Sequence, residues 1–183
     1  MSREKLPQDG VNREILISEE EIAKRVKELS DQISHDYKGK RPVLVSILKG
    51  SIVFLSDLMR NLDPDLLAEV DFMEVTSYGS SQESSRQPKI GKDLSTNIDG
   101  RHVIVVEDIV DTGYSFDSLL KILKARNPAS LKTCALVSKP DRREVEVPID
   151  YLGFEIPNVF VAGYGMDEDQ KYRGLRDIVF RKT

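Results

Sequence analysis

The chain has 183 residues, of which 39% are hydrophobic and 32% charged, and its formal net charge is -4 at pH 7. This composition is that of an ordinary globular domain and excludes the disordered, collagenous and membrane-spanning classes. The acidic balance disfavours a long nucleic acid as a partner, because nucleic-acid binders usually carry a basic excess. The single cysteine and the lack of an apolar leader after Met1 predict a location in the reducing cytoplasm.

Two helices and a strand are predicted in the first third of the chain. Ser18-Glu-Glu-Glu21 is typical of a capping box, and apolar residues then recur at helical spacing over residues 22–33. A second amphipathic pattern over residues 54–62 predicts another helix. Between the two, Val43–Leu48 is an apolar run typical of a strand buried on both faces.

The rest of the chain alternates strand and helix patterns. Strands are predicted at 70–76, 103–107 and 131–137, a helix at 115–125, and shorter strands at 151–154, 159–162 and 178–181. This alternation predicts an α/β fold in which helices flank a parallel-core sheet. We expect a single domain over residues 1–183, with a small C-terminal hood from about 150–183. Ligands of such sheets bind beyond the carboxyl ends of the strands.

Residues 77–98 interrupt this pattern with a long polar stretch rich in Ser, Gly, Gln and Lys. A polar stretch of this length inside a compact domain is often a lid over an active site. A disordered surface loop is an equally good interpretation of the composition alone.

Residues 103–115 carry the strongest functional pattern. The predicted strand ends in Glu107 and Asp108, and the loop Asp111-Thr-Gly-Tyr-Ser115 leads into a helix. Adjacent strand residues point to opposite faces, so both acids can face one ligand only if the strand has already ended there. The free N–H groups of a helix N-terminus, together with the loop hydroxyls, favour a phosphate. The segment therefore predicts a sugar-phosphate site.

Three other interpretations of this segment were weighed. The Asp111-Thr-Gly113 triplet also occurs in aspartic proteases, which need two copies, and this chain has one. The glycine-rich fingerprints of dinucleotide and P-loop sites do not occur in the chain. An acidic turn that caps a helix would explain three residues, but not the whole pattern.

The strand, the acidic pair and the loop resemble the donor-binding signature of type I phosphoribosyltransferases. The order of the further motifs resembles the hypoxanthine/guanine branch of that family, from about residue 44 to the C-terminus. These motifs are Leu48-Lys-Gly-Ser51, Thr76-Ser-Tyr-Gly79, Leu136-Val-Ser-Lys139, Gly153-Phe-Glu-Ile-Pro157, Val161-Ala-Gly-Tyr-Gly-Met-Asp167 and Tyr172-Arg173.

The resemblance implies roles for the acidic pair and the loop. Glu107 and Asp108 would hold the ribose hydroxyls of phosphoribosyl pyrophosphate, directly or through a metal-bound water, and would favour a ribosyl cation. Asp111 would manage the proton at N7 of the purine, as general base or orienting acceptor. The 5′-phosphate would be bound by Thr112, Gly113, Tyr114 and Ser115, with Ser115 at a position where the family often has Thr.

On the pyrophosphate side, the resemblance implies contacts from Lys49, Gly50 and Arg173. The Lys49–Gly50 bond can be cis in the family, whereas Lys-Gly after a strand is by itself more often an ordinary turn. Asp167 would bind Mg²⁺, as would Glu107 and Asp108, because hard oxygen ligands and a diphosphate suit this ion.

The purine would be bound by Lys139, Phe160, Val161 and Asp167. Lys139 would donate to the O6 carbonyl and so select 6-oxo over 6-amino bases. Phe160 would stack on the base, and the backbone of Val161 would read its edge. Taken alone, Lys139 would be a solvated surface charge and Phe160 a core residue. Arg143 is expected to reach the pyrophosphate or a neighbouring subunit.

The resemblance also places Ser77 and Tyr78 in a lid that closes over the donor and excludes water. It implies a transferase that converts hypoxanthine or guanine to the nucleoside monophosphate, acting as a homodimer or homotetramer without nucleic-acid or membrane partners. Two alternatives remain: a donor-sensing regulator that binds nucleic acid through the same fold, and a phosphoribosyltransferase for xanthine.

Overall fold

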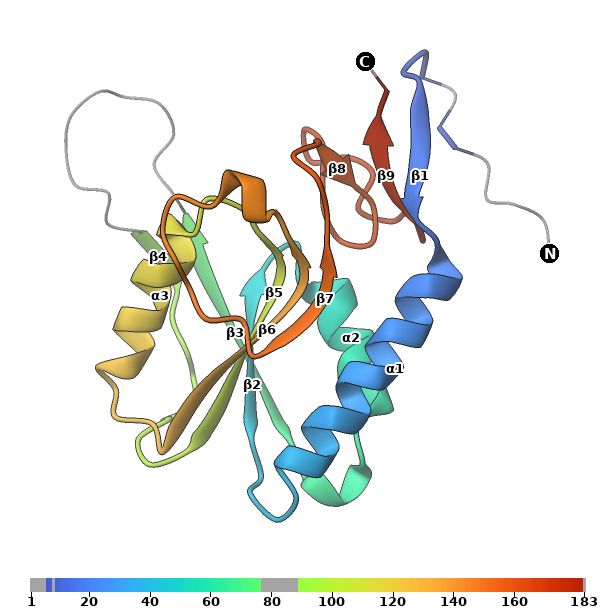
Figure 1. Ribbon diagram of the computed structural model, residues 1–183. Helices are drawn as coiled ribbons and strands as arrows, with labels where there is room; N and C mark the ends of the chain where they lie inside the picture. Colours follow the sequence, from blue (N-terminus) through green and yellow to red (C-terminus); the bar gives the residue numbers. More distant parts are fainter. Residues whose placement is uncertain (1–5, 8, 77–88, 183) are drawn as a thin grey trace.

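The structure is a computed structural model that describes residues 6–7, 9–76 and 89–182 (Figure 1). Its larger sheet has the strand order β4-β3-β2-β5-β6-β7, and every neighbouring pair is parallel except β3 with β4. The strands are β2 (Val43–Leu48), β3 (Glu69–Thr76), β4 (Lys89–Lys92), β5 (His102–Val110), β6 (Ser130–Ser138) and β7 (Tyr151–Glu155). The predicted α/β fold with a parallel-core sheet is confirmed.

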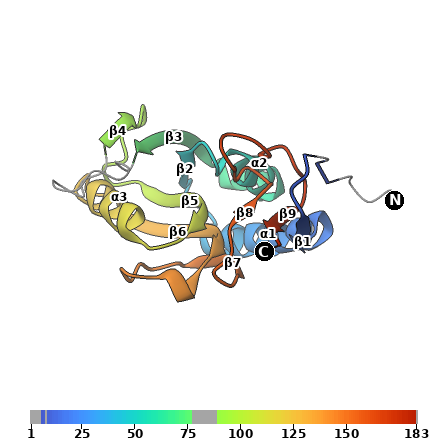
Figure 2. The ribbon, with the colours of Figure 1, turned by 90° about the horizontal axis from the view of Figure 1, so that it is seen from above.

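Helices cover both faces of this sheet. Helices α1 (Glu19–Asp36) and α2 (Ile52–Asn61) lie on one face, and α3 (Tyr114–Lys124) lies on the other (Figures 1 and 2). Strand β5 alternates accordingly, with Ile104 and Val106 packed in the layer under α1 and α2, and Val103 and Val105 in the layer under α3. Within the described part of the chain, no helix is both long and apolar enough to span a bilayer.

The predicted helix start at Ser18 is confirmed. The Ser18 side chain accepts a hydrogen bond from the backbone N–H of Glu21, and the Glu21 side chain accepts one from the backbone N–H of Ser18. This reciprocal pair satisfies two N–H groups that the first turn of the helix leaves without partners. It fixes the point where the chain leaves the hood and enters α1.

The strand order places a crevice between β2 and β5. From β2 the chain passes through α2 to β3 on one side, and from β5 it passes through α3 to β6 on the other. Ligands of open α/β sheets bind at such a switch point, beyond the carboxyl ends of the strands. The loops that follow Leu48 and Val110 lie there, and they carry Lys49, Gly50 and residues 111–113 of the predicted site.

The hood differs from the one expected from residues 150–183. It is a three-stranded antiparallel sheet in the order β1-β9-β8, built from β1 (Arg13–Ile17), β9 (Ile178–Arg181) and β8 (Val161–Ala162). Strand β7 instead pairs with β6 in the larger sheet. Figure 1 shows the hood standing beside the carboxyl ends of the larger sheet, with β1 and β9 next to each other.

The polar stretch predicted as a lid over 77–98 is only partly a loop. Lys89–Lys92 forms β4, which pairs with β3. Beyond it the side chain of Asp71 accepts hydrogen bonds from the backbone N–H groups of Ser95 and Thr96, each at 2.7 Å, and Ile98 is buried. The expected lid residues Ser77 and Tyr78 lie outside the described residues.

Two short 3₁₀ helices, η1 (Pro64–Leu66) and η2 (Pro140–Arg142), complete the described elements. Each carries a proline in its first turn, where the missing N–H group costs no hydrogen bond. Helix η2 matters for the site because it follows directly on the end of β6 at Ser138.

Candidate active site

The acidic pair lies within β5 and not beyond its end. Pairing between β5 and β6 continues to Val110 opposite Ser138, so the expectation that the strand ends at Glu107 is wrong. Glu107 and Asp108 accordingly line different pockets, as expected for adjacent residues of a strand. Glu107 faces the loop that precedes α3, whereas Asp108 faces the pocket that contains Lys139.

Both carboxyls are held in surroundings that penalise their charge. Burial raises the pKa of Glu107 well above its ordinary value, and the neighbouring charge of Asp108 raises it further. Burial also raises the pKa of Asp108, while the positive charge of Arg173 opposes this rise. Such a pair favours a ligand that brings hydroxyl donors or positive charge to it.

The loop from Asp111 to Ser115 forms the first pocket, of about 250 Å³. Gly113 caps α3 with a φ of 92°, and a β-carbon on it would lie 2.2 Å from the carbonyl oxygen of Val145. The carbonyl of Thr112 accepts hydrogen bonds from the N–H groups of Glu144 and Val145, both at 3.0 Å. The pocket combines polar and apolar residues, lined by Ile47, Leu48, Val75, Glu107, Ile109, Val110, Asp111, Thr112, Gly113, Ser115, Phe116 and Leu119.

This first pocket has the features of an anion site. It opens at the N-terminus of α3, where backbone N–H groups and the helix dipole favour negative charge. Thr112 and Ser115 add hydroxyls to its lining. Tyr114 begins α3 but is not part of the lining of either pocket.

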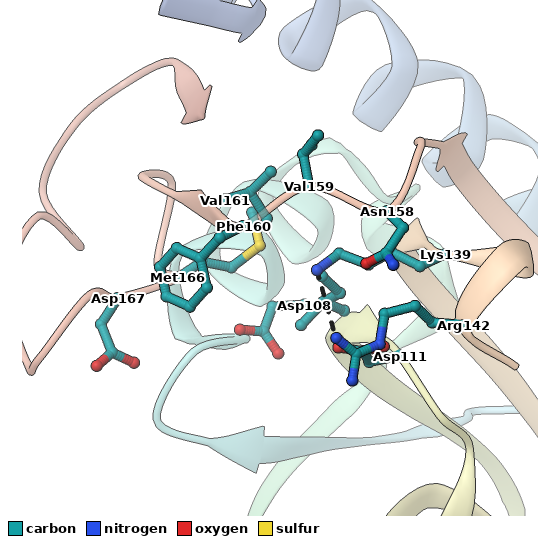
Figure 3. Close-up of a pocket in the computed structure, with 11 residues that line it drawn as sticks. Asp108, Asp111, Lys139, Arg142, Asn158, Val159, Phe160, Val161, Met166 and Asp167 are labelled. Carbon is teal, nitrogen blue, oxygen red and sulfur yellow. Dashed lines mark ion pairs between the residues drawn. The ribbon is translucent and has the colours of Figure 1, made fainter. Parts of the chain in front are cut away.

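The second pocket has a volume of about 360 Å³, within the range of small-ligand sites (Figure 3). Lys139 is 5% exposed, and its Nζ lies 3.8 Å from Oδ2 of Asp111. Burial lowers the pKa of Lys139, and the charge of Asp111 partly offsets this effect. Lys139 is therefore a buried cation beside a carboxylate, and the alternative of a solvated surface charge is wrong.

Phe160 stands on the other side of the second pocket. Figure 3 shows its ring and Asp167 across the pocket from Lys139. Phe160 is 58% exposed and precedes β8, so the alternative of a core residue on a strand is wrong. Val161, which begins β8, is buried and lines the same pocket.

Some residues of the second pocket were not predicted from the sequence: Ile109, Arg142, Asn158, Val159 and Met166. The most consequential is Arg142, whose Nε lies 3.1 Å from Oδ1 of Asp111. This contact lacks hydrogen-bond geometry, and among the described residues Oδ1 has no hydrogen-bond partner although it is buried. Asp111 therefore keeps a free acceptor that lies between two cations.

Arg143 does not take the position expected for it. Its Nη2 donates to Oγ of Ser138 at 2.7 Å and to the carbonyl of Val110 at 3.3 Å, so it braces the ends of β5 and β6. The pocket position goes to Arg142 because η2 is a 3₁₀ helix, in which residues three apart lie on one side. Lys139 and Arg142 are three residues apart, on either side of Pro140, and this spacing was the signal available in the sequence.

The loop after β2 is packed between Asp108 and the hood. A β-carbon on Gly50 would lie 1.7 Å from Oδ2 of Asp108, and one on Gly165 would lie 2.0 Å from the carbonyl oxygen of Gly50. Only glycine fits at either position, so the hood loop, the Gly50 loop and the β5 carboxyl are in direct contact. The cis peptide bond of this loop joins Leu48 to Lys49, one residue before the Lys49–Gly50 bond.

Arg173 and Asp167 are held together at the hood edge of the site. Nη2 of Arg173 lies 2.6 Å from Oδ1 of Asp167, and Nη1 donates to the carbonyl of Gly165 at 2.8 Å. Lys49 is exposed on the neighbouring loop but lines neither pocket. The structure thus brings Gly50, Asp108, Asp167 and Arg173 to one edge of the crevice.

The carboxylates fit a magnesium ion only if a ligand supplies further oxygens. In residues 6–7, 9–76 and 89–182, no three His, Cys, Asp or Glu side chains are grouped so that they could hold a metal ion. Mg²⁺ is usually bound by one or two carboxylates together with water and substrate phosphates. The hard oxygen donors at this edge suit that mode, and do not suit a metal bound by the protein alone.

The geometry of a phosphate loop beside a polar base-sized pocket agrees with the family comparison. Residues 13–169 match the family described as the phosphoribosyl transferase domain. The chain belongs to the phosphoribosyltransferase family. The predicted resemblance to the hypoxanthine/guanine branch is confirmed by relatives that align along nearly the whole chain.

The hypoxanthine-guanine phosphoribosyltransferase of Dictyostelium discoideum is 47% identical over 167 residues, 90% of this chain and 93% of that protein. The hypoxanthine phosphoribosyltransferase of Haemophilus influenzae is 45% identical over 165 residues, 88% of this chain and 91% of that protein. A crystal structure of a hypoxanthine phosphoribosyltransferase from Staphylococcus aureus superposes with a TM-score of 0.91 at 38% identity, covering 99% of this chain and 97% of that one. This phosphoribosyltransferase is therefore similar to that branch in both sequence and fold.

Proposed function

We propose that the protein transfers the 5-phosphoribosyl group of phosphoribosyl pyrophosphate to hypoxanthine or guanine, giving IMP or GMP and pyrophosphate in purine salvage. The observation that carries this proposal is that Asp111 lines both the phosphate-loop pocket and the pocket of Lys139 and Phe160. A nucleoside monophosphate has the same two ends, a phosphate and a base, joined by a ribose. The names of the relatives support the assignment.

In this proposal the second pocket holds the base. Lys139 donates to the O6 carbonyl of the purine, and Phe160 stacks on the ring from the opposite side. A 6-amino base offers no acceptor at that position, so it would leave the buried Lys139 ammonium without its partner. The backbone of Val161 meets the edge of the base, and Asp167 lies at the same end of the pocket.

The donor lies across the first pocket. The Thr112–Ser115 backbone and hydroxyls bind the 5′-phosphate at the start of α3. Glu107 and Asp108 share a side-chain hydrogen bond, so their carboxyl groups lie close together although the residues are adjacent in β5, and both accept hydrogen bonds from the ribose hydroxyls. Their negative charge also favours the cationic character that the ribose ring acquires as pyrophosphate leaves. The pyrophosphate is bound by the Lys49–Gly50 loop and by Arg173.

The reaction forms a bond between N9 of the purine and C1′ of the ribose while the bond from C1′ to the pyrophosphate oxygen breaks. Pyrophosphate leaves with the electron pair of that bond. The purine must then lose one proton, and the free Oδ1 acceptor of Asp111 takes it at N7. Lys139 and Arg142, on either side of Asp111, hold the carboxylate in place.

One magnesium ion would be held by the oxygens of Glu107 and Asp108 and a second by Asp167, each together with the diphosphate and water. When bound, the metal would neutralise negative charge on the pyrophosphate.

We further propose a single domain over residues 1–183, a cytoplasmic location and a homodimer or homotetramer. Sedimentation analysis of the purified protein distinguishes these assemblies from a monomer.

The test is steady-state turnover of hypoxanthine, guanine, xanthine and adenine with phosphoribosyl pyrophosphate and Mg²⁺. We expect saturable turnover of hypoxanthine or guanine and none of adenine. Turnover of xanthine alone would replace the substrate assignment. A protein that binds the donor but converts no base would overturn the enzymatic assignment in favour of a regulator.

A further inference from the structure

The segment that carries Asp167 and Arg173 is a hairpin with a strained tip. Glu168 and Lys171 exchange two backbone hydrogen bonds, of 3.1 and 3.0 Å. The two residues between them, Asp169 and Gln170, have φ values of 52° and 63°, and Tyr172 has one of 69°. Two-residue turns of this type favour glycine, which is absent here. Strained backbone of this kind persists only where its surroundings hold it in place.

Arg181 of β9 pairs with Glu168, and the remaining side chains that hold the hairpin from outside come from the other end of the chain. Arg13, in β1, donates from Nη2 to Oε2 of Glu168 at 2.8 Å, and its Cζ lies 4.1 Å from the centre of the Tyr172 ring. Its Nη1 lies 2.9 Å from both carboxylate oxygens of Asp9, and Asp9 in turn accepts a hydrogen bond from the Tyr172 hydroxyl. One guanidinium therefore contacts both arms of the hairpin.

The Arg13 side chain is buried among these contacts. It is 2% exposed, and a buried guanidinium is retained only where it is paired and hydrogen-bonded. The contacts with Glu168 and Asp9 raise the pKa of Arg13 against the effect of burial, so its charge is permanent. Arg13 lines neither of the two pockets but contacts the hairpin, so its effect on the site passes through the hairpin.

The two hairpin residues that Arg13 contacts are the chain neighbours of the two pyrophosphate-side residues. Glu168 follows Asp167, and Tyr172 precedes Arg173. Because Glu168 and Tyr172 are held against Arg13, their neighbours Asp167 and Arg173 face each other at the edge of the site. Nη2 of Arg173 lies 2.6 Å from Oδ1 of Asp167. We propose that Arg13 is a positioning residue that holds Asp167 and Arg173 in the geometry that binds pyrophosphate. This inference rests on the proposed function.

The structure supplies a matched control on the same two strands. Lys182, next to β9, pairs with Glu14 of β1 at 2.6 Å, and both side chains are about half exposed. This pair joins the ends of the hood sheet without contacting the 167–173 hairpin. Lys182→Gln therefore removes an ion pair of the hood and leaves the proposed clamp intact.

The experiment is titration calorimetry of the wild type, Arg13→Gln and Lys182→Gln with two ligands, magnesium pyrophosphate and IMP. IMP has no pyrophosphate, so its contacts lie in the two pockets and not at Arg173. We expect Arg13→Gln to raise the Kd for pyrophosphate about tenfold, a change typical of one misplaced charged contact. Its Kd for IMP should change much less, by about twofold, because IMP shares only the Asp167 end of the base pocket with this edge and does not reach Arg173. Lys182→Gln should bind both ligands like the wild type.

A second pair of variants keeps the test valid if Arg13→Gln fails to fold. Tyr172→Leu removes the ring that lies over Arg13 and should weaken pyrophosphate binding, whereas Tyr172→Phe keeps that ring and should restore most of it. Unchanged pyrophosphate binding in Arg13→Gln or Tyr172→Leu overturns the clamp. A parallel loss of IMP and pyrophosphate also overturns it, because it would show general damage to the hood. A wild type that binds neither ligand overturns the proposed function, and the clamp with it.

Discussion

The phosphate loop at Asp111–Ser115 and the 167–173 hairpin are held in place by different kinds of contact. Both have backbone with positive φ next to a proposed anion site. The phosphate loop uses Gly113 and is held by backbone hydrogen bonds to the carbonyl of Thr112. The hairpin uses Asp169, Gln170 and Tyr172, and is held by the side chain of Arg13.

The difference shows which half of the site depends on distant residues. The phosphate loop joins β5 directly to α3, so the larger sheet and its helix fix it. The hairpin is placed by ion pairs that link it to β1, more than 150 residues earlier in the chain. A side-chain change far from the crevice should therefore alter the pyrophosphate half and leave the phosphate half intact.

Asp111 joins the two pockets, so its loss should have the largest effect on activity. We expect Asp111→Ala to lower kcat by about 10²-fold or more, because the proton at N7 loses its acceptor. Steady-state kinetics with hypoxanthine measures this change. Asp117→Asn, which alters an exposed ion pair on α3, is the control and should leave kcat unchanged. An unchanged kcat in Asp111→Ala would remove this residue from the mechanism.

Lys139 should affect the base and not the donor. Lys139→Ala should weaken hypoxanthine binding by about 10- to 100-fold, the range expected for a hydrogen bond from a charged donor. Donor affinity, measured by titration with phosphoribosyl pyrophosphate, should stay close to that of the wild type. A parallel loss of donor affinity would mean that Lys139 serves the phosphates.

Gly113 should matter for stability because the phosphate loop needs a positive φ and close backbone packing at this position. Gly113→Ala puts a β-carbon 2.2 Å from the Val145 carbonyl and a side chain at a φ of 92°. We expect the free energy of unfolding to fall by about 1–3 kcal/mol, the usual range for strained backbone. Urea denaturation measures it, and Gly100→Ala, also at positive φ but in open space, separates the clash from the strain.

A substitution at the tip of the hairpin should change the stability in the opposite direction. Asp169→Gly removes a side chain from a left-handed position at the exposed tip. Left-handed backbone costs an ordinary residue about 1–2 kcal/mol, and added glycine flexibility costs about 0.5–1 kcal/mol. We therefore expect a small rise in thermal stability, with pyrophosphate affinity unchanged because Arg13 still holds both arms. A clear loss of stability would show that the tip is not strained in the folded protein.

Much of the larger sheet could be predicted because its strands are locally encoded. Strands β2, β5 and β6 each contain a mainly apolar run, and the two helices next to β2 in the sequence, α1 and α2, show clear apolar spacing. The phosphate loop was likewise predictable, since its residues are contiguous. The end of β5 was misjudged because Ile109 and Val110 follow two acids, and only the pairing with β6 shows that the strand continues.

What could not be predicted depends on partners that are distant in the sequence. Strand β1 has five residues, two of them charged, and becomes a strand only beside β9. Strand β4, Lys-Ile-Gly-Lys, is too polar to stand out from the stretch around it. The sequence near Arg13 shows no pattern that links it to Glu168 or Tyr172. Such contacts follow from the assembled hood and not from any local signal.

The hood sheet pairs the first strand of the fold with its last, and this has a consequence for synthesis. A ribosome releases the chain from its N-terminus onward, and domains begin to fold as they emerge. The larger sheet, which ends at β7, can assemble while synthesis continues, but β1 must wait for β9 at Ile178–Arg181. A nascent chain can therefore complete its phosphate loop while its pyrophosphate side is still open, and it gains the complete site only after β9 has been synthesised.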